Sequence, residues 1–279
     1  MNNLKLRVSS SIASFREKAE KIWRLEPRQI DDFTSDVFFF GLYHLSDWET
    51  FMKCKGKRYV CWAGGDVRNL LMGYAFSDGI ELEKSKLFSC LNWHKIFKIH
   101  KAEHFVENKD EQKKLARLGI KAKIVPTFLE DINNFPVCYK PADKPNVYIS
   151  ARKGQEKEYG VYTIQKIAPK LPNHTFHIYG VDGKNTKNII FHGNIPLEQF
   201  NSEIKGYQIA LRLNVSDGFS EILSKGILLG QICITRIKYP LINNYKTEKQ
   251  LIKLLKTARP NLKAREYYKF NQFPFLRST

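Results

Sequence analysis

Long apolar runs are absent from this sequence, and so is any pattern typical of export. No apolar run reaches the roughly 18–20 residues that a membrane-spanning helix needs. The longest runs, 37–43 and 226–234, have the length of a strand or of a short helix followed by a strand. The opening segment, MNNLKLRVSSSIASFREK, lacks the apolar block and the small-residue cleavage site of a secretory signal. We therefore expect a cytoplasmic protein.

Cysteine is scarce and unpaired in the sequence. The 279 residues include five cysteines, an odd number, and no two of them form a C-x-x-C pair. A disulfide framework and a zinc site both need paired cysteines, so the spacing argues against both. A D-x-D motif, which would hold a metal ion beside a diphosphate, is also missing. We expect reduced, mostly buried thiols and no metal at the site.

Acidic residues are outnumbered. The chain has 46 Lys and Arg against 28 Asp and Glu, which gives a net charge of +18 and a pI near 9.6. Up to Pro145 there are 25 basic and 19 acidic residues, and after it 21 and 9, so the excess lies mainly in the second half. This charge predicts a polyanionic partner: nucleotide phosphates, an anionic membrane surface at which the protein would be peripheral, or nucleic acid. A generally lysine-rich proteome would produce the same charge.

Short apolar or aromatic runs alternate with helix-length segments along most of the chain. Strands that alternate with helices predict α/β units on parallel sheets. Residues 1–26 differ, because Leu4, Val8, Ile12 and Phe15 predict a basic amphipathic helix that packs on the domain or lies on a membrane. The expected strands are 37–40, 58–62, 99–106, 121–125, 146–151, 174–179, 189–192, 209–213 and 232–235, and the expected helices are 47–53, 109–118, 157–170, 197–205, 219–229 and 248–255.

A proline-rich segment, NFPVCYKPADKP, interrupts this alternation near the middle of the chain. Its prolines break both the helical and the strand periodicity, which is typical of an extended linker. A fresh strand, NVYISA, follows at once. We therefore expect domains at 1–135 and 146–279, joined by a linker at 136–145. The aromatic tail of the second domain is expected to pack back on the first.

Ligands of open α/β sheets bind beyond the carboxyl ends of the strands, and one such end is ISARKGQEKEYG. A strand ends at Ala151, and a loop with Arg152, Lys153 and Lys157 leads into a helix. Basic side chains beside a helix N-terminus suit a diphosphate, because the free amides and the helix dipole add to the cations. The alternative is a solvated basic loop.

A second strand end lies in RLNVSDGFSEILSKGILLG. Ser216 or Asp217 would be the N-cap of the next helix, and Gly218 would allow a close backbone approach to a ligand. Ser220 would lie in the first turn, where exposed amides face a phosphate. A plain helix cap explains Asp217 equally well.

A third strand end, RYVCWAGGDVR, belongs to the first half of the chain. The strand leads into a flexible turn that presents the carboxylate of Asp66 and the guanidinium of Arg68. The alternative is a polar turn that only caps a helix.

Several segments together resemble the family 4 glycosyltransferases of the GT-B fold. HFVENKDEQKKLARLGIKAKIVPTF is similar to the last unit of their N-terminal domain, and IAPKLPNHTFHIYG and NIIFHGNIP are similar to the start of their nucleotide-binding domain. LRLNVSDGFSEILSKGILLGQICIT resembles their donor-binding unit. The resemblance covers most of residues 36–245 in the correct order. It implies two Rossmann-like domains that face each other across a cleft, with the N-terminal domain reduced in size.

The resemblance also implies roles for residues of the second half. Arg152 and Lys157 match the catalytic basic pair that neutralises the donor diphosphate. Gly180 matches the turn that borders the nucleotide base. The loop that touches the sugar and the phosphates matches Asp217, Gly218, Phe219 and Ser220.

On the acceptor side, the resemblance implies that Asp66, with Gly64 and Gly65, forms a loop that faces the cleft. Asp66 is then the candidate that orients or deprotonates the acceptor. His44 and His104 are rival candidates, although a lone histidine is more often structural than catalytic.

Lys225 departs from the family pattern. The family has a glutamate eight residues after the first acidic residue, and this glutamate accepts hydrogen bonds from the nucleotide ribose. Lys225 stands at that position after Asp217, and a lysine has no acceptor. Either Lys225 points at a phosphate, or it pairs with Glu221 one turn earlier.

The implied activity is transfer of a sugar, with retention of configuration, from a UDP- or GDP-linked donor to a saccharide or lipid-linked acceptor. No cofactor and no metal are implied, because cations and helix amides stabilise the departing diphosphate. Two alternatives stay open: a phage-type DNA glycosyltransferase that acts on hydroxymethylated bases, and a non-catalytic α/β protein that binds nucleotides or other polyanions.

Overall fold

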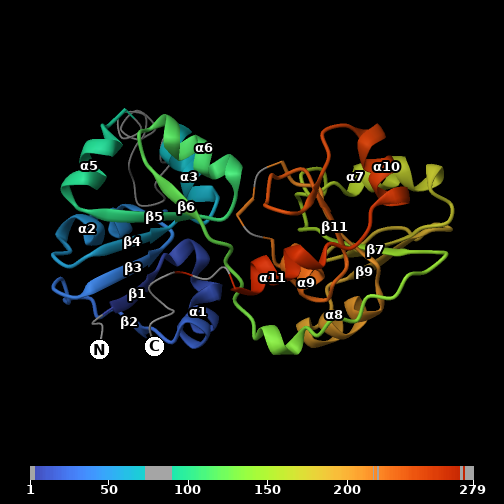
Figure 1. Ribbon diagram of the computed structural model, residues 1–279, viewed down its shortest axis with the longest axis horizontal. Coiled ribbons are helices and arrows are strands. Elements are labelled where there is room, and N and C mark those ends of the chain that lie inside the picture. The colour runs from blue at the N-terminus through green and yellow to red at the C-terminus, as the bar shows by residue number, and fades with distance from the viewer. Residues whose placement is uncertain (1–3, 73–89, 216, 219, 271–272, 274–279) are drawn as a thin grey trace. The chain divides into compact units, whose positions relative to one another are not determined.

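The chain forms two compact units in a computed structural model that describes residues 4–72, 90–215, 217–218, 220–270 and 273 (Figure 1). The first unit consists of Met1–Asp131 with Asp217–Phe219 and Gln272–Thr279, and the second of Ile132–Ser216 with Ser220–Asn271. Each unit contains one parallel sheet with helices on its faces, so the predicted α/β class is confirmed.

In the first unit, a six-stranded sheet has the order β2-β1-β3-β4-β5-β6. All of its strand pairs are parallel. Its elements are β1 (Leu4–Val8), the 3-10 helix η1 (Ser10–Phe15), α1 (Arg16–Trp23), β2 (Glu26–Pro27), β3 (Asp36–Phe40), α2 (Leu45–Lys53), β4 (Arg58–Cys61), α3 (Gly65–Met72), α5 (Trp93–Ile99), β5 (Ala102–Val106), α6 (Lys109–Arg117) and β6 (Ala122–Ile124).

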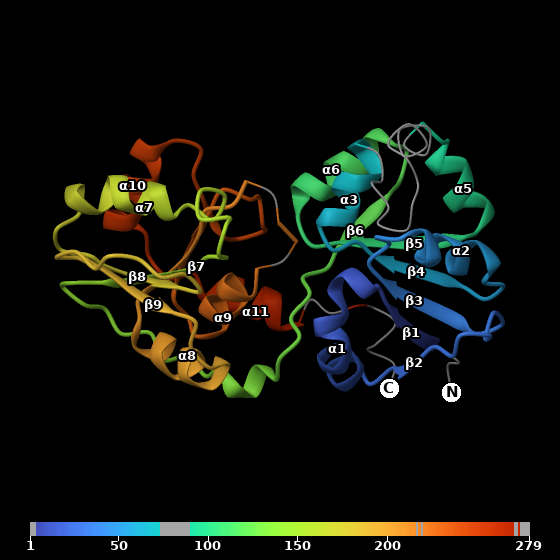
Figure 2. The ribbon, with the colours of Figure 1, turned by 180° about the vertical axis from the view of Figure 1, so that it is seen from behind.

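The sheet of the first unit is buried on both faces because successive side chains of a strand point to opposite sides. Along β3, Phe39 packs with α2, and Phe38 packs on the other face, against Trp23 of α1 at a ring distance of 5.0 Å. Phe273, distant in sequence, joins the second cluster 4.9 Å from the Phe38 ring. The helices α2, α3, α5 and α6 cover one face and α1 lies on the other (Figure 2).

The helix predicted over residues 1–26 is wrong in its first part. Leu4, Leu6 and Val8 are buried alternately with Lys5 and Arg7, so this segment forms β1 and pairs with β3. The side-chain period is therefore two and not 3.6, and only α1 is α-helical. Consequently the first predicted strand, 37–40, is the third strand along the chain.

The second unit has a sheet of order β12-β11-β10-β7-β8-β9, in which all strand pairs are again parallel. Its elements are η2 (Ile132–Asn134), β7 (Asn146–Ser150), α7 (Val161–Ile167), η3 (Ala168–Lys170), β8 (Thr175–Tyr179), β9 (Ile189–Gly193), α8 (Leu197–Glu203), η4 (Ile204–Gly206), β10 (Ile209–Arg212), α9 (Glu221–Leu228), β11 (Ile232–Thr235), β12 (Asn243–Asn244), α10 (Glu248–Thr257) and α11 (Leu262–Phe270).

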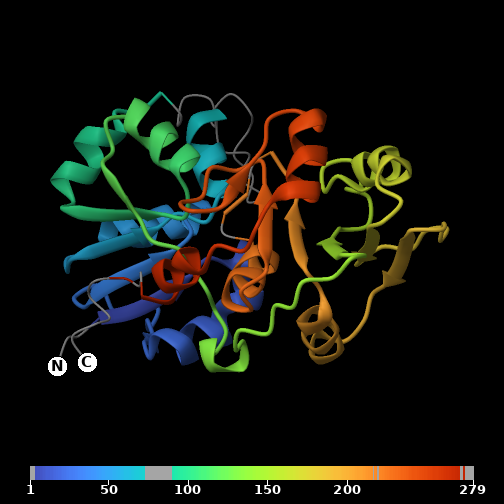
Figure 3. The same cartoon turned by 45° about the vertical axis from the view of Figure 1, so that its right-hand side comes forward.

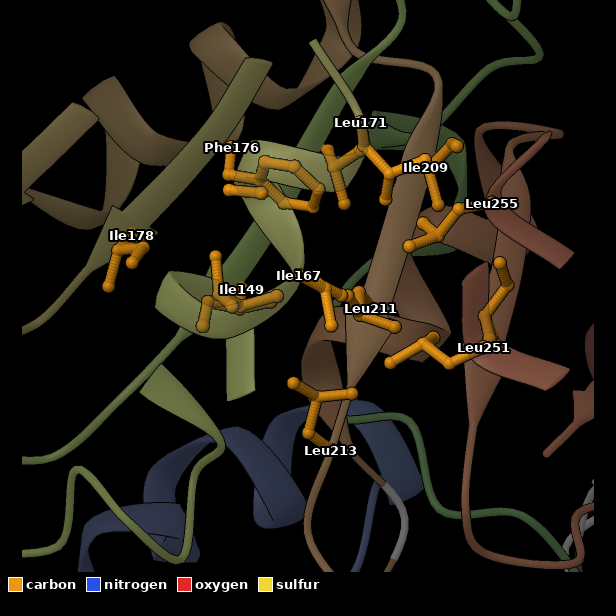
Figure 4. Packing of buried hydrophobic residues seen from close by; sticks show 14 of the residues in the cluster. Ile149, Ile167, Leu171, Phe176, Ile178, Ile209, Leu211, Leu213, Leu251 and Leu255 are labelled. Atoms are coloured by element: carbon orange, nitrogen blue, oxygen red, sulfur yellow. The ribbon is translucent and has the colours of Figure 1, made fainter. Parts of the chain in front are cut away.

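The core of the second unit lies between this sheet and the helices α7 and α10, which share one face (Figure 3). Ile149 of β7, Phe176 of β8 and Leu211 of β10 point to that face and meet Ile167 and Leu251 from the two helices (Figure 4). Helices α9 and α11 lie side by side (Figures 1 and 2). Among the described residues, no helix is both long and apolar enough to cross a membrane.

Candidate functional site

Two loops meet at the carboxyl edge of the second sheet. Strands β7 and β10 are neighbours, so the segments that follow them, 151–160 and 213–215, leave the sheet side by side. Gly160 has a φ of +82°, and a Cβ atom built on it would lie 2.4 Å from Leu213 Cβ. The two loops are therefore in direct backbone-to-side-chain contact.

Arg152 and Lys157 lie in the first of these loops, and both side chains are exposed. The helix predicted from residue 157 begins later, at Val161, because residues 152–160 form successive turns. Within them, the Tyr159 N–H donates to the Gln155 carbonyl over 3.0 Å. The loop thus presents two cations on a folded scaffold and not on the first turn of a helix.

Gly180 lies beside the start of the same loop. It follows β8, the other neighbour of β7, and has a φ of +85°. A Cβ atom at this position would lie 2.3 Å from the Ala151 carbonyl oxygen, so only glycine fits. Gly180 and the loop containing Arg152 are therefore packed together at one edge of the sheet.

The structure adds two polar residues that the sequence analysis missed. Arg212, at the end of β10, is 8% exposed, and its guanidinium lies 4.7 Å from the centre of the Tyr159 ring. Asn214 is 9% exposed, and in the described part of the chain its buried Oδ1 has no hydrogen-bond partner. The sequence signal for both residues is the segment IALRLN, in which Arg212 and Asn214 are polar residues at the end of an otherwise apolar strand.

The predicted start of the next helix needs correction. Helix α9 begins at Glu221 with Ser220 as its N-cap, so neither Ser216 nor Asp217 caps it and Ser220 precedes its first turn. The Ser220 carbonyl accepts hydrogen bonds from the backbone N–H and the hydroxyl of Ser224, each over 2.9 Å, while its own hydroxyl makes no capping bond. Phe219 lies outside the described residues.

Lys225 is buried inside the second unit and is only 1% exposed. Its Nζ lies 5.3 Å from the centre of the Phe200 ring and 5.9 Å from that of Phe135. A cation over the face of an aromatic ring is attracted by the ring quadrupole. The side chain is thus held among rings, and contact of Lys225 with a phosphate stays a prediction.

In the first unit, Asp66 joins two loops at the carboxyl edge of the sheet. Its side chain is fully buried, and it accepts hydrogen bonds from the N–H groups of Leu42 (3.0 Å), Ala63 (3.0 Å) and Val67 (2.9 Å). Burial raises the pKa of Asp66 to about 7, while these N–H groups act in the opposite direction. This geometry suits a residue that holds the loops after β3 and β4 in place.

The other acceptor-side residues lie at the same edge, except His104. His44 follows β3, and its Nε2 is 2.7 Å from the Ser11 hydroxyl. Gly64 has a φ of +84°, and Gly65 begins α3. His104 is instead in the middle of β5, where its ring packs 4.4 Å from that of Phe97.

Two buried carboxyl groups near Asp66 were not singled out from the sequence. Glu107 follows β5 and Glu111 lies on α6, and the side chains are 4% and 3% exposed. Burial and the neighbouring Glu107 raise the pKa of Glu111 well above its usual range. A Cβ atom on Gly218, which belongs to this unit, would lie 2.1 Å from Glu107 Oε2. The Asn108 side-chain N–H donates to the Asp217 carbonyl over 3.1 Å.

The described residues contain no group of three His, Cys, Asp or Glu side chains that could hold a metal ion. The sequence matches no protein-family profile and no curated protein sequence.

Solved structures do resemble this fold. TarM aligns with 85% of this chain at a TM-score of 0.56 and 15% identity, and the aligned part is 52% of TarM, so this chain spans about half its length. One structure of S. aureus TarM contains fondaparinux, α-GlcNAc-glycerol and UDP. Sucrose-phosphate synthase from Thermosynechococcus elongatus aligns with 86% of this chain and 70% of its own, at a TM-score of 0.56 and 12% identity.

HepE from Anabaena, solved with UDP and glucose, aligns over nearly the whole of both chains. The alignment covers 96% of this chain and 94% of HepE, with a TM-score of 0.58 and 10% identity. At such identities the likeness concerns the fold. The chain therefore has the α/β fold of the GT-B glycosyltransferases, with two parallel six-stranded sheets.

Proposed function

We propose that this protein is a glycosyltransferase that moves a sugar from a UDP- or GDP-linked donor to a saccharide or lipid-linked acceptor. The GT-B fold supports this proposal, since the structural neighbours include proteins solved with UDP and glucose or with UDP and a GlcNAc-glycerol. The observation on which it depends is the edge of the second sheet, where Arg152, Lys157, Gly180 and Asn214 come from adjacent strand ends.

In the proposed reaction, the bond between the sugar C1 and the diphosphate oxygen breaks, and its electron pair leaves with the nucleotide diphosphate. Arg152 and Lys157 stabilise the negative charge that develops there, each by about 2–4 kcal/mol in the transition state. The acceptor hydroxyl forms the new bond to C1, and its proton passes to the departing diphosphate oxygen, which has taken the electron pair of the broken bond. Charge neutralisation by side chains would replace a metal ion, and no cofactor is needed.

Asn214 is the proposed contact for the nucleoside. Its buried Oδ1 has no partner in the described part of the chain, and an unmet acceptor of this kind costs stability until a donor reaches it. A ribose hydroxyl or a base N–H would supply that donor. This contact would take the place of the glutamate that relatives have at the position of Lys225.

On the acceptor side, we propose that Asp66 acts through the loops that it holds. Its oxygens are occupied by the N–H groups of Leu42, Ala63 and Val67, so it orients the acceptor loop instead of removing the acceptor proton directly. His44 and the glycines Gly64 and Gly65 at the same edge would line that loop.

Thermal stability in the presence of nucleotide sugars tests donor binding. UDP-glucose, UDP-GlcNAc and GDP-mannose are added in excess, and one of them should raise the melting temperature, because a ligand that binds only the folded state stabilises it by mass action. The same donor should also be hydrolysed slowly, and this hydrolysis is measured as the release of UDP or GDP.

Arg152→Ala should abolish the donor-dependent shift and leave the melting temperature without donor unchanged. The matched control is Lys187→Ala, an exposed residue before β9 and thus at the opposite edge of the same sheet. An equal loss of the donor-dependent shift in Lys187→Ala would mean that Arg152 does not belong to the diphosphate site. Stabilisation by unrelated polyanions with no release of nucleotide would instead favour a non-catalytic binding protein.

Turnover assays with a donor that binds identify the acceptor and the stereochemistry. Oligosaccharide or lipid-linked acceptors should increase nucleotide release. In the product, the NMR coupling of the proton on C1 of the transferred sugar should show that the configuration is retained. Stimulation only by DNA that contains hydroxymethylated bases, with a steep salt dependence, would favour the DNA-modifying alternative.

A further inference from the structure

The first unit has a basic surface at the amino edge of its sheet. The segments 91–102 and 112–124, which contain α5, most of α6 and β6, include eight Lys and Arg residues and no Asp or Glu. Strands β5 and β6 are parallel neighbours, so the connections that enter them from α5 and α6 lie side by side at this edge. Glu103 of β5 pairs with Lys123 of β6 over 3.2 Å, which leaves seven of the eight cations in excess. Asp66 and the loops that it joins lie at the opposite, carboxyl edge.

Helix α5 has one buried side and one side in solvent. Trp93 and Phe97 are buried and lie four residues apart, so they share the side of the helix that packs on the core. The other side has the exposed Lys95 and Lys98 and, beside them, Ile99, whose side chain is 63% exposed. The solvent side of α5 therefore combines cations with an apolar side chain.

The connection from α6 to β6 lies against α5 and extends its basic side. His94 Nδ1 of α5 donates to the Gly119 carbonyl, and Lys121 lines the same shallow depression as Lys98. Lys101, which is exposed, immediately precedes β5, as Lys121 precedes β6. We define the α5 surface as Lys95, Lys98, Ile99, Lys101 and Lys121.

We propose that the α5 surface binds the anionic face of a lipid bilayer. The negative potential of an anionic leaflet attracts the lysines, and Ile99 enters the boundary between headgroups and acyl chains. A nucleic acid would contact the same lysines but would leave Ile99 in water. The α5 surface thus takes the place of the membrane contact expected of residues 1–26, whose first part forms the buried strand β1. This binding is independent of the proposed glycosyl transfer.

Sedimentation of the full chain with lipid vesicles tests the proposal. Vesicles of phosphatidylcholine alone are compared with vesicles that also contain phosphatidylglycerol, which is anionic. The protein should sediment with the anionic vesicles only. Binding should be lost as NaCl rises from about 0.1 M to about 0.5 M, because salt screens the attraction between the lysines and the headgroups. Absence of binding to the anionic vesicles at the lower salt concentration would overturn the proposal.

A triple variant tests the contribution of the cations. Lys95→Gln/Lys98→Gln/Lys121→Gln should weaken binding to the anionic vesicles by about a hundredfold, since each lysine near such a surface contributes to the attraction. All three side chains are exposed, so the melting temperature should stay that of the wild type.

The matched control for charge is on α10. Lys249→Gln/Lys253→Gln/Lys256→Gln removes the same charge from three exposed lysines, which are spaced along the side of α10 that faces away from the buried Leu251 and Leu255. This variant should bind the vesicles within about threefold of the wild type, because its lysines lie outside the α5 surface. Equal losses in the two triple variants would show that the net charge of the protein, and not the α5 surface, attracts the vesicles.

The apolar contribution separates a membrane from a nucleic acid. Ile99→Ser should weaken vesicle binding by about fivefold, because less apolar surface is removed from water. Leu197→Ser, at an exposed apolar residue of α8, is the control and should bind as the wild type does. Unchanged vesicle binding of Ile99→Ser, or tighter binding of the wild type to a DNA duplex than to the anionic vesicles, would overturn the proposal.

Discussion

At the scale of single residues, Asp66 and Lys225 show how this protein accommodates buried charged groups. Asp66 is surrounded by backbone N–H groups and Lys225 by aromatic faces. Each environment favours one sign of charge, since amide hydrogens stabilise an anion and ring faces stabilise a cation. A substitution that preserves the size of the side chain but changes its charge should therefore be costly at both positions.

We predict that Asp66→Asn lowers the free energy of unfolding by about 1–3 kcal/mol. One carboxylate oxygen becomes an NH₂ group, so the N–H of Leu42 or those of Ala63 and Val67 lose their acceptor inside the protein. Urea unfolding measures the change. Asp31→Asn, at an exposed position, is the control and should change stability by less than about 0.5 kcal/mol. Equal stabilities of the two variants would contradict a structural role for Asp66.

Lys225→Glu should destabilise the second unit by more than about 2 kcal/mol, because a carboxylate would replace the cation over the rings of Phe135 and Phe200. Lys225→Met preserves the apolar stem and should cost less. Urea unfolding of both variants provides the comparison. A Lys225→Glu protein as stable as the wild type would contradict the role of the two rings in holding a cation at this position.

At the scale of elements, the site of the second unit depends on close contacts between loops. Gly160 touches Leu213 and Gly180 touches the Ala151 carbonyl, so neighbouring strand ends approach more closely than side chains would allow. Both glycines also have positive φ, which L residues adopt only with strain. Substitutions at these positions test the contact between the two loops.

Gly160→Ala and Gly154→Ala form a matched pair within one loop. Both glycines have a φ near +80°, but a Cβ atom at Gly154 would meet nothing within 4 Å, whereas at Gly160 it would overlap Leu213. Gly154→Ala should cost about 1–2 kcal/mol of stability from backbone strain alone. Gly160→Ala should cost about 1–3 kcal/mol more, from overpacking. Urea unfolding measures both changes. Equal losses of stability in the two variants would mean that Leu213 moves aside at no cost in free energy.

The predicted bounds of helices and strands were correct where one periodicity ran through a segment. They were wrong where a helix passed into a strand within the predicted segment. The bounds of β11 were predicted correctly, because a short apolar run lies between a glycine and polar residues. The strand predicted over 99–106 begins only at Ala102, because Ile99 still belongs to α5, whose Trp93 and Phe97 are spaced as on one helix face. Neither α3 nor α5 was predicted.

At the scale of the whole molecule, buried histidines should make stability depend on pH. His177 stacks on Tyr207 at 4.4 Å, with Nδ1 3.0 Å from His192 Nε2 and Nε2 3.1 Å from Asn146 Oδ1. Burial, aided by His192, lowers the pKa of His177 to about 4, while Glu203 acts in the opposite direction. His104, in the other unit, is lowered to a pKa of about 3 by burial.

The sign of the effect follows from proton uptake. Below pH 6.5 the unfolded chain binds protons on these histidines and the folded chain does not, so stability falls as the pH falls towards 4. The pKa of Asp66, raised to about 7, acts in the opposite sense, because its contribution is lost as the pH rises from 4 to 7. We predict that His177 lowers the stability of its unit by about 1–2 kcal/mol between pH 6.5 and pH 5.

Urea unfolding of His177→Phe at pH 7 and pH 5 tests this prediction. The phenyl ring preserves the stacking on Tyr207 but cannot titrate, so the loss of stability between the two pH values should be smaller than in the wild type. An identical pH dependence would show that His177 is not responsible. His94→Phe, an exposed residue, is the control and should preserve the wild-type dependence.

The order of residues along the chain was sufficient to predict the α/β class, most strands and the strand ends where basic and glycine residues gather. These properties depend on local periodicity and on turn residues, which act over a few positions. It was not sufficient for the burial of Asp66 and Lys225, or for the buried Oδ1 of Asn214, which has no hydrogen-bond partner among the described residues. These properties depend on which distant segments meet, because the solvation and the hydrogen-bond partners of a side chain are set by neighbours that only the folded chain brings to it.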